Sequence, residues 1–318
     1  MNKTAFLRSF AGLALVSLVL ISCNRRGVTD KFTDTPTTGK VSIAVDATFQ
    51  PIIAAELPVF HAVYKYATVT PKYINENEAI NLLLRDSVRL AIVSRQLNDK
   101  EKQFFKSKKF FPKEFPVAVD GIAILVHPSN TDTLFTIEQL RKIMLGEITD
   151  WKQINKASRK GSIKVVFDDP NSSTVRFVVD SLTRTGNLSS QLSAMTYSLD
   201  VVQYVAENPN AIGVIGVSWI SDSRDPKSLS FLSKIKVAGI SAAGQATPEN
   251  SYQPFQAYIA TGKYPLTRFI YMILTEPRAG LGTGFASFVS SDKGQRIILK
   301  TGVLPYTQPV RIVNVKPE

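Results

Sequence analysis

The chain has 318 residues, of which 44% are apolar and 20% are charged, and its formal net charge is +12 at pH 7. This composition fits an ordinary folded protein. The charge favours anionic partners, but Lys and Arg are spread along the chain without an arginine–aromatic nucleic-acid motif, which argues against nucleic acid and for a membrane surface or a small anion.

The first 22 residues are typical of an export signal. Lys3 and Arg8 form a positive leader, and residues 10–21 are almost continuously apolar, which is the pattern of a secretory signal peptide. A membrane-spanning helix needs about 20 apolar residues, and this run is shorter. We therefore expect a signal peptide at 1–22 rather than a spanning anchor.

Residues 20–23, Leu-Ile-Ser-Cys, resemble a bacterial lipobox, in which the Cys is acylated and becomes the mature N-terminus. Cys23 is the only Cys, so an intramolecular disulfide is excluded. The alternative is a Cys that is removed with the signal. Acylation predicts a folded domain tethered to a membrane surface outside the cytoplasm, with 23–40, rich in Thr, Asp, Pro, Gly and Lys, as a flexible tether.

The remaining part of the chain, about 280 residues, exceeds the usual size of one core and predicts two lobes. Apolar stretches of strand and helix length alternate along it. The expected strands are 41–45, 69–73, 90–93, 121–126, 162–167, 211–217 and 269–274, and the expected helices are 52–64, 137–145, 174–182 and 285–300. This order predicts an α/β fold with largely parallel sheets, with lobes formed by crossings of the chain because no long linker divides it.

The decapeptide DDPNSSTVRF, residues 168–177, places small polar residues between an expected strand and an expected helix. In open α/β sheets ligands bind beyond the carboxyl ends of the strands, where the next helix begins. Hydroxyl groups and free backbone amides there suit an anion. The alternative is that Asn171 or Ser172 only caps the helix, which is common.

Four segments resemble the substrate-binding protein of bacterial phosphate ABC transporters, in the order found in that family. They are Thr136–Ile154 (family pattern "L..I..G.I..W..I"), Asn210–Gly216 ("GAIGYVG"), Tyr264–Arg268 ("YPLTRP"), and Phe285–Gln295 followed by Gly302–Pro305 ("FL.F.LS.EGQ…GY.P"). The resemblance covers most of residues 41–305.

The resemblance implies a type II periplasmic-binding-protein fold, with two α/β lobes, joined by a hinge, that close over one oxyanion in the cleft between them. Lobe 1 would combine 41–120 with 255–318, and lobe 2 would hold 121–254. The implied function is an extracytoplasmic solute-binding lipoprotein in the cell envelope, on the periplasmic or extracellular face of a membrane. It would bind an inorganic oxyanion, phosphate in the first place, and deliver it to an ABC transporter permease, without a cofactor or metal.

Ligand-binding residues are carried over where the motifs align. Ala47-Thr48-Phe49 looks like the family's "ATF", Ser94-Arg95 falls at "ASD", also seen as "SSR", and Ser172-Ser173-Thr174 falls on "SGT". Asp168 stands where the family has an Arg, and Arg176 is a second basic candidate that ranks below Arg95. The expected ligand-binding residues are Thr48, Phe49, Ser94, Arg95, Asp168, Ser172, Ser173, Thr174 and Arg176.

The chain departs from the family's pattern in two places. Arg95 and Asp168 stand where the family has an Asp and an Arg, so an Arg95–Asp168 pair of reversed polarity is expected if both reach the site. Asp168 could then orient Arg95 or accept a proton from a monoprotonated oxyanion; the alternative is a surface ion pair or no contact. The family's Ser/Gly-rich helix start is replaced by 74–78, INENE, where Glu76 and Glu78 would repel an anion that they faced, and Asn75 or Asn77 could cap the helix and donate a hydrogen bond.

Catalysis is not expected. His61 and His127 are the only His residues and lie far apart, and no HExxH, Cys/His cluster, GxSxG or Walker loop occurs. The alternatives to phosphate binding are another oxyanion such as molybdate or sulfate, and a surface lipoprotein that keeps the fold but binds a protein or a membrane. A phosphate-ester hydrolase is a weaker third idea.

Overall fold

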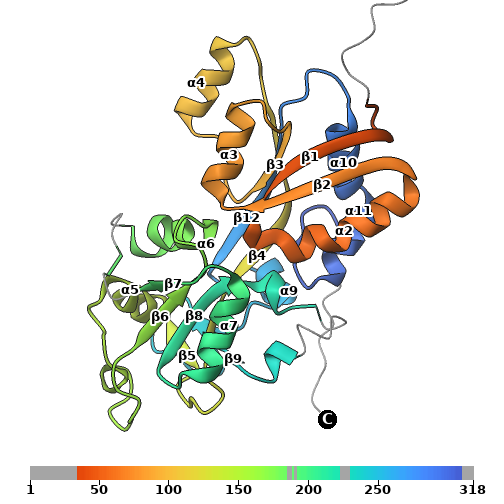
Figure 1. Cartoon of the computed structure of the whole chain (residues 1–318). Coiled ribbons are helices and arrows are strands. Elements are labelled where there is room, and N and C mark those ends of the chain that lie inside the picture. The colour runs from red at the N-terminus through yellow and green to blue at the C-terminus, as the bar shows by residue number, and fades with distance from the viewer. Residues whose placement is uncertain (1–33, 185–187, 190–191, 223–229, 310–318) are drawn as a thin grey trace, which may run out of the picture. The chain divides into compact units, whose positions relative to one another are not determined.

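The computed structural model describes residues 34–184, 188–189, 192–222 and 230–309 (Figure 1). The strands are β1 (Thr38–Asp46), β2 (Tyr66–Ile74), β3 (Leu90–Val93), β4 (Lys113–Val126), β5 (Leu134–Thr136), β6 (Lys164–Phe167), β7 (Ser193–Ala194), β8 (Ala211–Gly216), β9 (Lys236–Val237), β10 (Gly239–Ser241), β11 (Ser251–Tyr252), β12 (Thr267–Leu274) and β13 (Leu304–Pro305). The α-helices are α2 (Gln50–Val63), α3 (Glu76–Leu84), α4 (Asp99–Ser107), α5 (Ile137–Leu145), α6 (Ser173–Phe177), α7 (Ser198–Glu207), α9 (Gln256–Ala260), α10 (Leu281–Ser290) and α11 (Asp292–Lys300).

Most of the expected elements are confirmed, and α5 and β3 have the expected bounds. Local signals explain why α5 was well defined by sequence. Thr136 forms a capping box with Gln139 at its start, and Gly146 ends it with a left-handed φ of 77°, a conformation that costs glycine little. The expected helix 174–182 is α6 followed directly by one π-helical segment, Val178–Thr183.

The main sheet is mixed, so the expectation of largely parallel sheets is wrong at its centre. Its order is β2-β1-β3-β12-β4-β8-β6-β7. The strands β1, β2 and β3 pair in parallel at one end, and β6, β7 and β8 pair in parallel at the other. Between them β12 and β4 run antiparallel to their neighbours.

The long strand β4 carries the chain from one end of the sheet to the other. Its first half pairs with β12 and its second half with β8, whereas the sequence indicated only the second half, 121–126. The first half carries charges, and Pro116 stands beside an irregularity in the β12 register, where a residue without an N–H group is tolerated. Because of these features, the apolar pattern did not predict the first half of β4.

Alternating side chains divide the core among the faces of the sheet. Ile43 and Val45 belong to one large cluster that continues over both ends of the sheet, whereas Ala44 belongs to a cluster on the opposite face at the β1 end. Ile122 and Ile124 of β4 point into a third cluster, on the other face at the β8 end. This alternation is expected of strands that are covered on both faces.

The segment just before β12 packs with the β8 end of the sheet. Ile259, Tyr264 and Leu266 belong to the core cluster that also holds Ile122 and Ile124 of β4. The backbone N–H of Ile122 donates to the carbonyl of Leu266 at 2.8 Å. The two segments therefore lie side by side.

The expected signal peptide, Cys23 and the tether up to residue 33 lie outside the described residues. Thr38–Lys40, the end of the expected tether, already form part of β1. Among the residues that the structure describes, no helix has the length and apolar character needed to cross a membrane.

Candidate functional site

Polar residues from both lobes meet where strands give way to helices. Asp46 ends β1, Thr48 follows it, and the others follow β2 (Glu76), β3 (Ser94) and β6 (168–174). Arg268 of β12 joins them. Because the carboxyl ends of parallel strands form the usual ligand-binding edge of an α/β sheet, this is the candidate site.

The 168–174 segment is held by hydroxyl groups around a buried carboxylate. Ser172 caps α6 by accepting from the Val175 N–H. Its Oγ also donates to Asp168 Oδ1 at 2.5 Å, and Ser198 Oγ and Thr174 Oγ1 donate to Asp168 Oδ2 at 3.1 and 3.5 Å. Burial raises the pKa of Asp168, and these hydroxyl donors partly offset that effect.

Ser173 joins the lobes at the centre of the site. Its Oγ lies 3.1 Å from Thr48 Oγ1 and accepts from Arg268 Nη1 at 2.8 Å. The Arg268 guanidinium lies 4.9 Å from the centroid of the Phe49 ring. It donates from Nε and Nη2 to Asp120 Oδ2 at 3.1 and 2.9 Å. Hydroxyl groups and one buried cation are thus brought together by segments far apart in the sequence.

Asp46, at the end of β1, adds a fully buried carboxylate. Its Oδ1 accepts from the Thr48 N–H at 3.0 Å, and Oδ2 has no bond of ordinary hydrogen-bond geometry among the described residues. Burial, with the nearby Glu76 charge, raises the pKa of Asp46 to about 7. The Ser173 hydroxyl and the Arg268 charge lie close enough to act against the rise of its pKa. Asp46 can therefore hold a proton or accept one near neutral pH.

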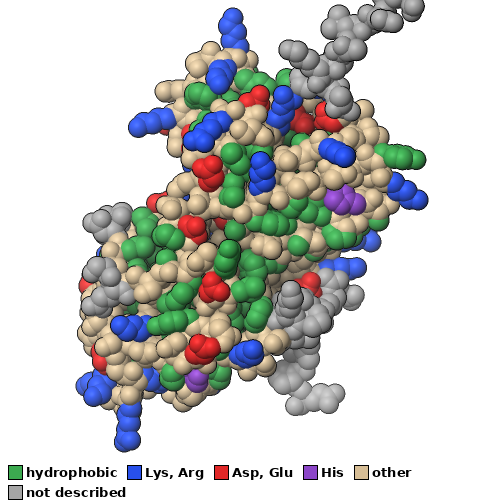
Figure 2. Space-filling view, in the orientation of Figure 1, with side chains coloured by type: hydrophobic (Ala, Val, Ile, Leu, Met, Phe, Trp, Pro, Cys, Tyr) green, Lys and Arg blue, Asp and Glu red, His purple; other side chains and the backbone are tan. Residues whose placement is uncertain are grey.

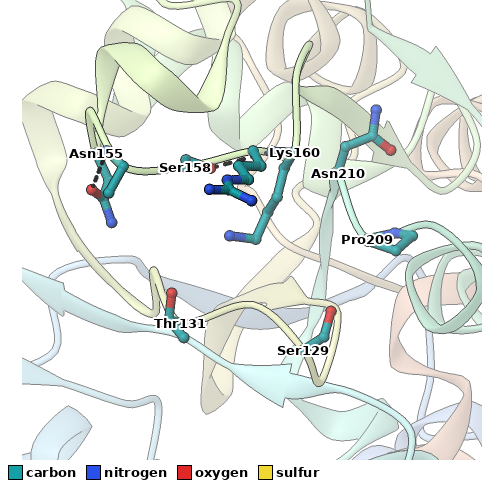
Figure 3. A pocket seen from close by; sticks show the side chains of 9 residues that line it. Ser129, Thr131, Asn155, Ser158, Lys160, Pro209 and Asn210 are labelled. Atoms are coloured by element: carbon teal, nitrogen blue, oxygen red, sulfur yellow. Dashed lines mark hydrogen bonds between the residues drawn. The ribbon is translucent and has the colours of Figure 1, made fainter.

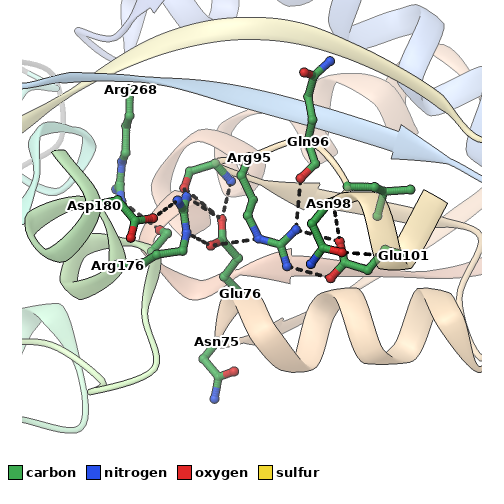
Figure 4. A network of polar contacts seen from close by, with 12 residues as sticks. Asn75, Glu76, Arg95, Gln96, Asn98, Glu101, Arg176, Asp180 and Arg268 are labelled. Atoms are coloured by element: carbon green, nitrogen blue, oxygen red, sulfur yellow. Dashed lines mark hydrogen bonds and ion pairs between the residues drawn. The ribbon is translucent and has the colours of Figure 1, made fainter. Parts of the chain in front are cut away.

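Glu76 and Arg176 form the second contact between the lobes (Figure 4). Arg176 Nε donates to Glu76 Oε2, and Nη2 donates to Ser94 Oγ at 2.6 Å. Nη1 binds Asp180 at 3.1 Å. Burial would raise the pKa of Glu76, but the charge and hydrogen bonds of Arg176, together with Ser94, outweigh it and lower that pKa.

The expected Arg95–Asp168 pair is wrong. Arg95 instead forms a bidentate pair with Glu101, with both N–O distances 2.8 Å, and its Nε lies 3.9 Å from Glu76 Oε2. Glu101 belongs to the capping box of α4, only six positions along the chain, so Arg95 turns toward its own lobe (Figure 4). Arg176, and not Arg95, is therefore the arginine that reaches from one lobe to the other.

Several members of this cluster were not predicted from the sequence, namely Asp46, Asp120, Ser198 and Arg268, and Glu76 was not expected to join the lobes. Arg268 ends the Tyr264–Arg268 motif and Asp46 directly precedes Ala47-Thr48-Phe49, so both stood beside quoted motifs. Asp120 had no such signal, because it lies in the half of β4 that was not recognised. Asn75 does cap α3, by accepting from the Glu78 N–H.

Other features of the molecule show less chemistry. A cavity of about 640 Å³ in the second lobe is lined by Ser129, Arg159 and Lys160 among others (Figure 3), but Lys160 pairs with Asp132 at 3.3 Å. On the face shown in Figure 2, Lys and Arg side chains are spread out and not gathered in one patch. His61 Nε2 accepts from the Val69 N–H at 3.0 Å, which is a structural role.

Comparison with known proteins agrees with this organisation. A family model described as "PBP superfamily domain" matches residues 31–293. The chain is 28% identical over 284 residues to "Phosphate-binding protein PstS" of Staphylococcus saprophyticus, covering 88% of this chain and 83% of that one. It is 25% identical over 249 residues to the protein of that name from Pseudomonas aeruginosa, covering 74% and 73%.

Two solved structures share the fold. One is a putative phosphate ABC transporter substrate-binding protein with bound phosphate from Clostridium perfringens, with a TM-score of 0.71, 22% identity, and coverage of 85% of this chain and 100% of that one. The other is an ABC-type phosphate transport receptor from Vibrio cholerae, with a TM-score of 0.64, 22% identity, and coverage of 84% and 100%. The two-lobed α/β fold is therefore that of periplasmic binding proteins.

Proposed function

The chain belongs to the PBP superfamily, and we propose that it binds one inorganic oxyanion, phosphate, between its lobes and delivers it to an ABC transporter permease. The observation that carries this proposal is the Ser173 centre, where Thr48, Ser173 and Arg268 bring hydroxyl and guanidinium donors to one buried point between the lobes. The names of the relatives support phosphate as the ligand.

The donors suit an oxyanion in number and kind. Hydrogen bonds to a charged group contribute about 1.5 to 3 kcal/mol each, so three or four of them account for micromolar binding, which corresponds to about −8 kcal/mol. Arg268 is positioned for this role by Asp120 and by the Phe49 ring, which limit its rotamers.

Asp46 offers a basis for discrimination between oxyanions. Its Oδ2, which lacks a partner of ordinary hydrogen-bond geometry, can accept a hydrogen bond from the proton that phosphate carries at neutral pH, whereas fully ionised sulfate has no proton to donate. We assigned this part to Asp168 from the sequence. In the structure hydroxyl donors occupy both oxygens of Asp168, so Asp46 is the better candidate.

Calorimetric titration of the purified protein with phosphate, sulfate and molybdate tests this function. We expect micromolar phosphate binding that Ser173→Ala weakens at least tenfold, since one lost charge-assisted bond is worth about 1.4 kcal/mol or more. Ser129→Ala, in the separate cavity of the second lobe, is the matched control and should bind normally. Absence of phosphate binding by the unaltered protein would refute the proposal.

We also propose that the protein acts without catalysis, outside the cytoplasm, and is anchored through acylated Cys23 after removal of residues 1–22. The tether would run from Cys23 to the start of β1. Mass spectrometry of the membrane fraction should find the acyl chains on Cys23, and Cys23→Ser should release the protein from membranes. A Cys23→Ser protein that stays membrane-bound would contradict the anchor.

For the lobes, the proposed bounds are 41–120 with 255–318 for the first and 121–254 for the second. The packing of residues 259–266 with the second core favours moving the return crossing to about residue 267. A surface lipoprotein that keeps the fold but binds a protein or a membrane is the alternative function, and the one observation that favours it is the buried Glu76 carboxylate between the lobes.

A further inference from the structure

Glu76 adds a negative charge to the junction of the lobes, where the carboxylates of Asp46, Asp120 and Asp168 are also buried. It is the first residue of α3, and its side chain is only 1% exposed. A carboxylate at the start of a helix is favoured by the helix dipole, but that explanation does not require burial. Glu78, in the same turn, is only half-buried and makes none of the contacts described for Glu76.

The contacts of Glu76 are those that a bound oxyanion would make. Oε1 accepts from Ser94 N at 2.7 Å, from Ser94 Oγ at 2.8 Å and from Arg176 Nη2 at 3.4 Å. Oε2 accepts from Arg176 Nε and lies 3.9 Å from Arg95 Nε. A backbone amide, a hydroxyl and a guanidinium fork form a typical donor set for carboxylate and phosphate alike.

This contact also joins the two lobes. Ser94 follows β3 in the first lobe, and Arg176 belongs to α6 in the second lobe. Three nitrogens of Arg176 are engaged, by Glu76, Ser94 and Asp180. The lobes are therefore held together at this point by an anion that the chain itself supplies.

The charges around Glu76 keep it ionised. Arg176 is its closest cation and Arg95 a more distant one, and Asp46 is the carboxylate whose pKa its charge raises. Asp180 and Glu101 lie beyond the two arginines. An external anion at Ser94 and Arg176 would meet a like charge at short range, which is unfavourable in a buried site.

We propose that the Glu76 carboxylate is an internal surrogate of the oxyanion: it closes the lobes in the absence of ligand, and an external oxyanion reaches Ser94 and Arg176 only by displacing it. The displacement rests on the proposed function, whereas the closure does not. Binding is then an exchange of one anion for another, which lowers the net affinity for the external one.

The test compares Glu76→Gln with Glu78→Gln in the full protein. Both variants remove one negative charge from the first turn of α3, so the effect on the helix dipole is matched. Small-angle scattering without ligand measures closure, and calorimetric titration with inorganic phosphate measures displacement. We expect Glu76→Gln to raise the radius of gyration and to bind phosphate at least tenfold more tightly, with Glu78→Gln like the unaltered protein in both measurements.

The two measurements separate this inference from the proposed function. An unchanged radius, or phosphate affinity no tighter than that of Glu78→Gln, overturns the surrogate even if phosphate binds. A third outcome is an expanded Glu76→Gln protein with no phosphate binding by any variant. The expansion would support closure of the lobes by Glu76. The missing phosphate binding would refute both the displacement of Glu76 by phosphate and the proposed function. If Glu76→Gln does not fold, Arg176→Gln removes the other partner and should expand the ligand-free protein; a compact Arg176→Gln protein overturns the proposal.

Discussion

Replacing Arg268 by Met should separate the structural role of this residue from its role toward a ligand. Arg268 and Asp120 are 4% and 0% exposed, and both bonds between them end on Asp120 Oδ2. Without the guanidinium, Asp120 is a buried carboxylate that has lost its cation. Breaking a buried ion pair from one side costs about 3 to 5 kcal/mol, so we expect Arg268→Met to lower the free energy of unfolding by that amount.

The loss should depend on pH. Burial raises the pKa of Asp120, and the Arg268 charge partly offsets it, so removing Arg268 raises that pKa further. A folded-state pKa above the unfolded value means that the folded protein binds more protons, and stability then falls as pH rises. The destabilisation should thus be larger at pH 8 than at pH 5, by at most about 1.4 kcal/mol per pH unit.

Urea unfolding and phosphate titration of three variants form the assay. Arg296→Met is the control, because Arg296 and Asp292 form an exposed pair on α11 that is worth less than about 1 kcal/mol. In Asp120→Leu/Arg268→Met neither charge of this pair stays buried, so most of the stability should return while phosphate binding stays at least tenfold weakened. A single variant as stable as the control, or a double variant that binds phosphate normally, would refute the reasoning.

Three further predictions concern other buried or paired groups. Glu56 is fully buried without a hydrogen-bond partner among the described residues, and burial raises its pKa to about 9. The free energy of unfolding therefore falls as pH rises from about 4.5 to 9, because the folded protein must keep or lose this proton at a cost. In urea unfolding, the free energy of unfolding of Glu56→Gln should rise relative to that of the unaltered protein by up to about 4 kcal/mol between pH 5 and pH 8. Arg95→Ala should change phosphate affinity less than threefold, because Arg95 is engaged by Glu101, and a tenfold loss in calorimetry would return Arg95 to the ligand site. Ser172→Ala should lower the free energy of unfolding by about 1 to 3 kcal/mol in thermal or urea unfolding, since it removes a helix cap and a hydrogen-bond donor to buried Asp168. A decrease below about 0.5 kcal/mol, the usual limit for a surface substitution, would contradict these contacts.

The order of elements could be predicted from the sequence because its signals are local. Apolar periodicity and a capping residue act within a few positions, so β3 and α5 were found with their observed bounds. The hydroxyl-rich turn at 172–174 was likewise visible as a strand-to-helix junction. The mixed centre of the sheet was not visible, because pairing direction is set by segments about 150 positions apart, such as Asp120 and Arg268.

The sequence by itself determined which residue types stand at the carboxyl ends of the strands, and only the tertiary structure decided which of their charges meet. Arg95 binds Glu101, six positions away, and Arg176 binds Glu76, one hundred positions away. The sequence indicates all four charges equally well, because a charged residue is compatible with many partners until packing brings a particular one within hydrogen-bond distance. Burial then makes that pairing matter, since an ion costs little when it is unpaired in water and several kcal/mol when it is unpaired inside the protein.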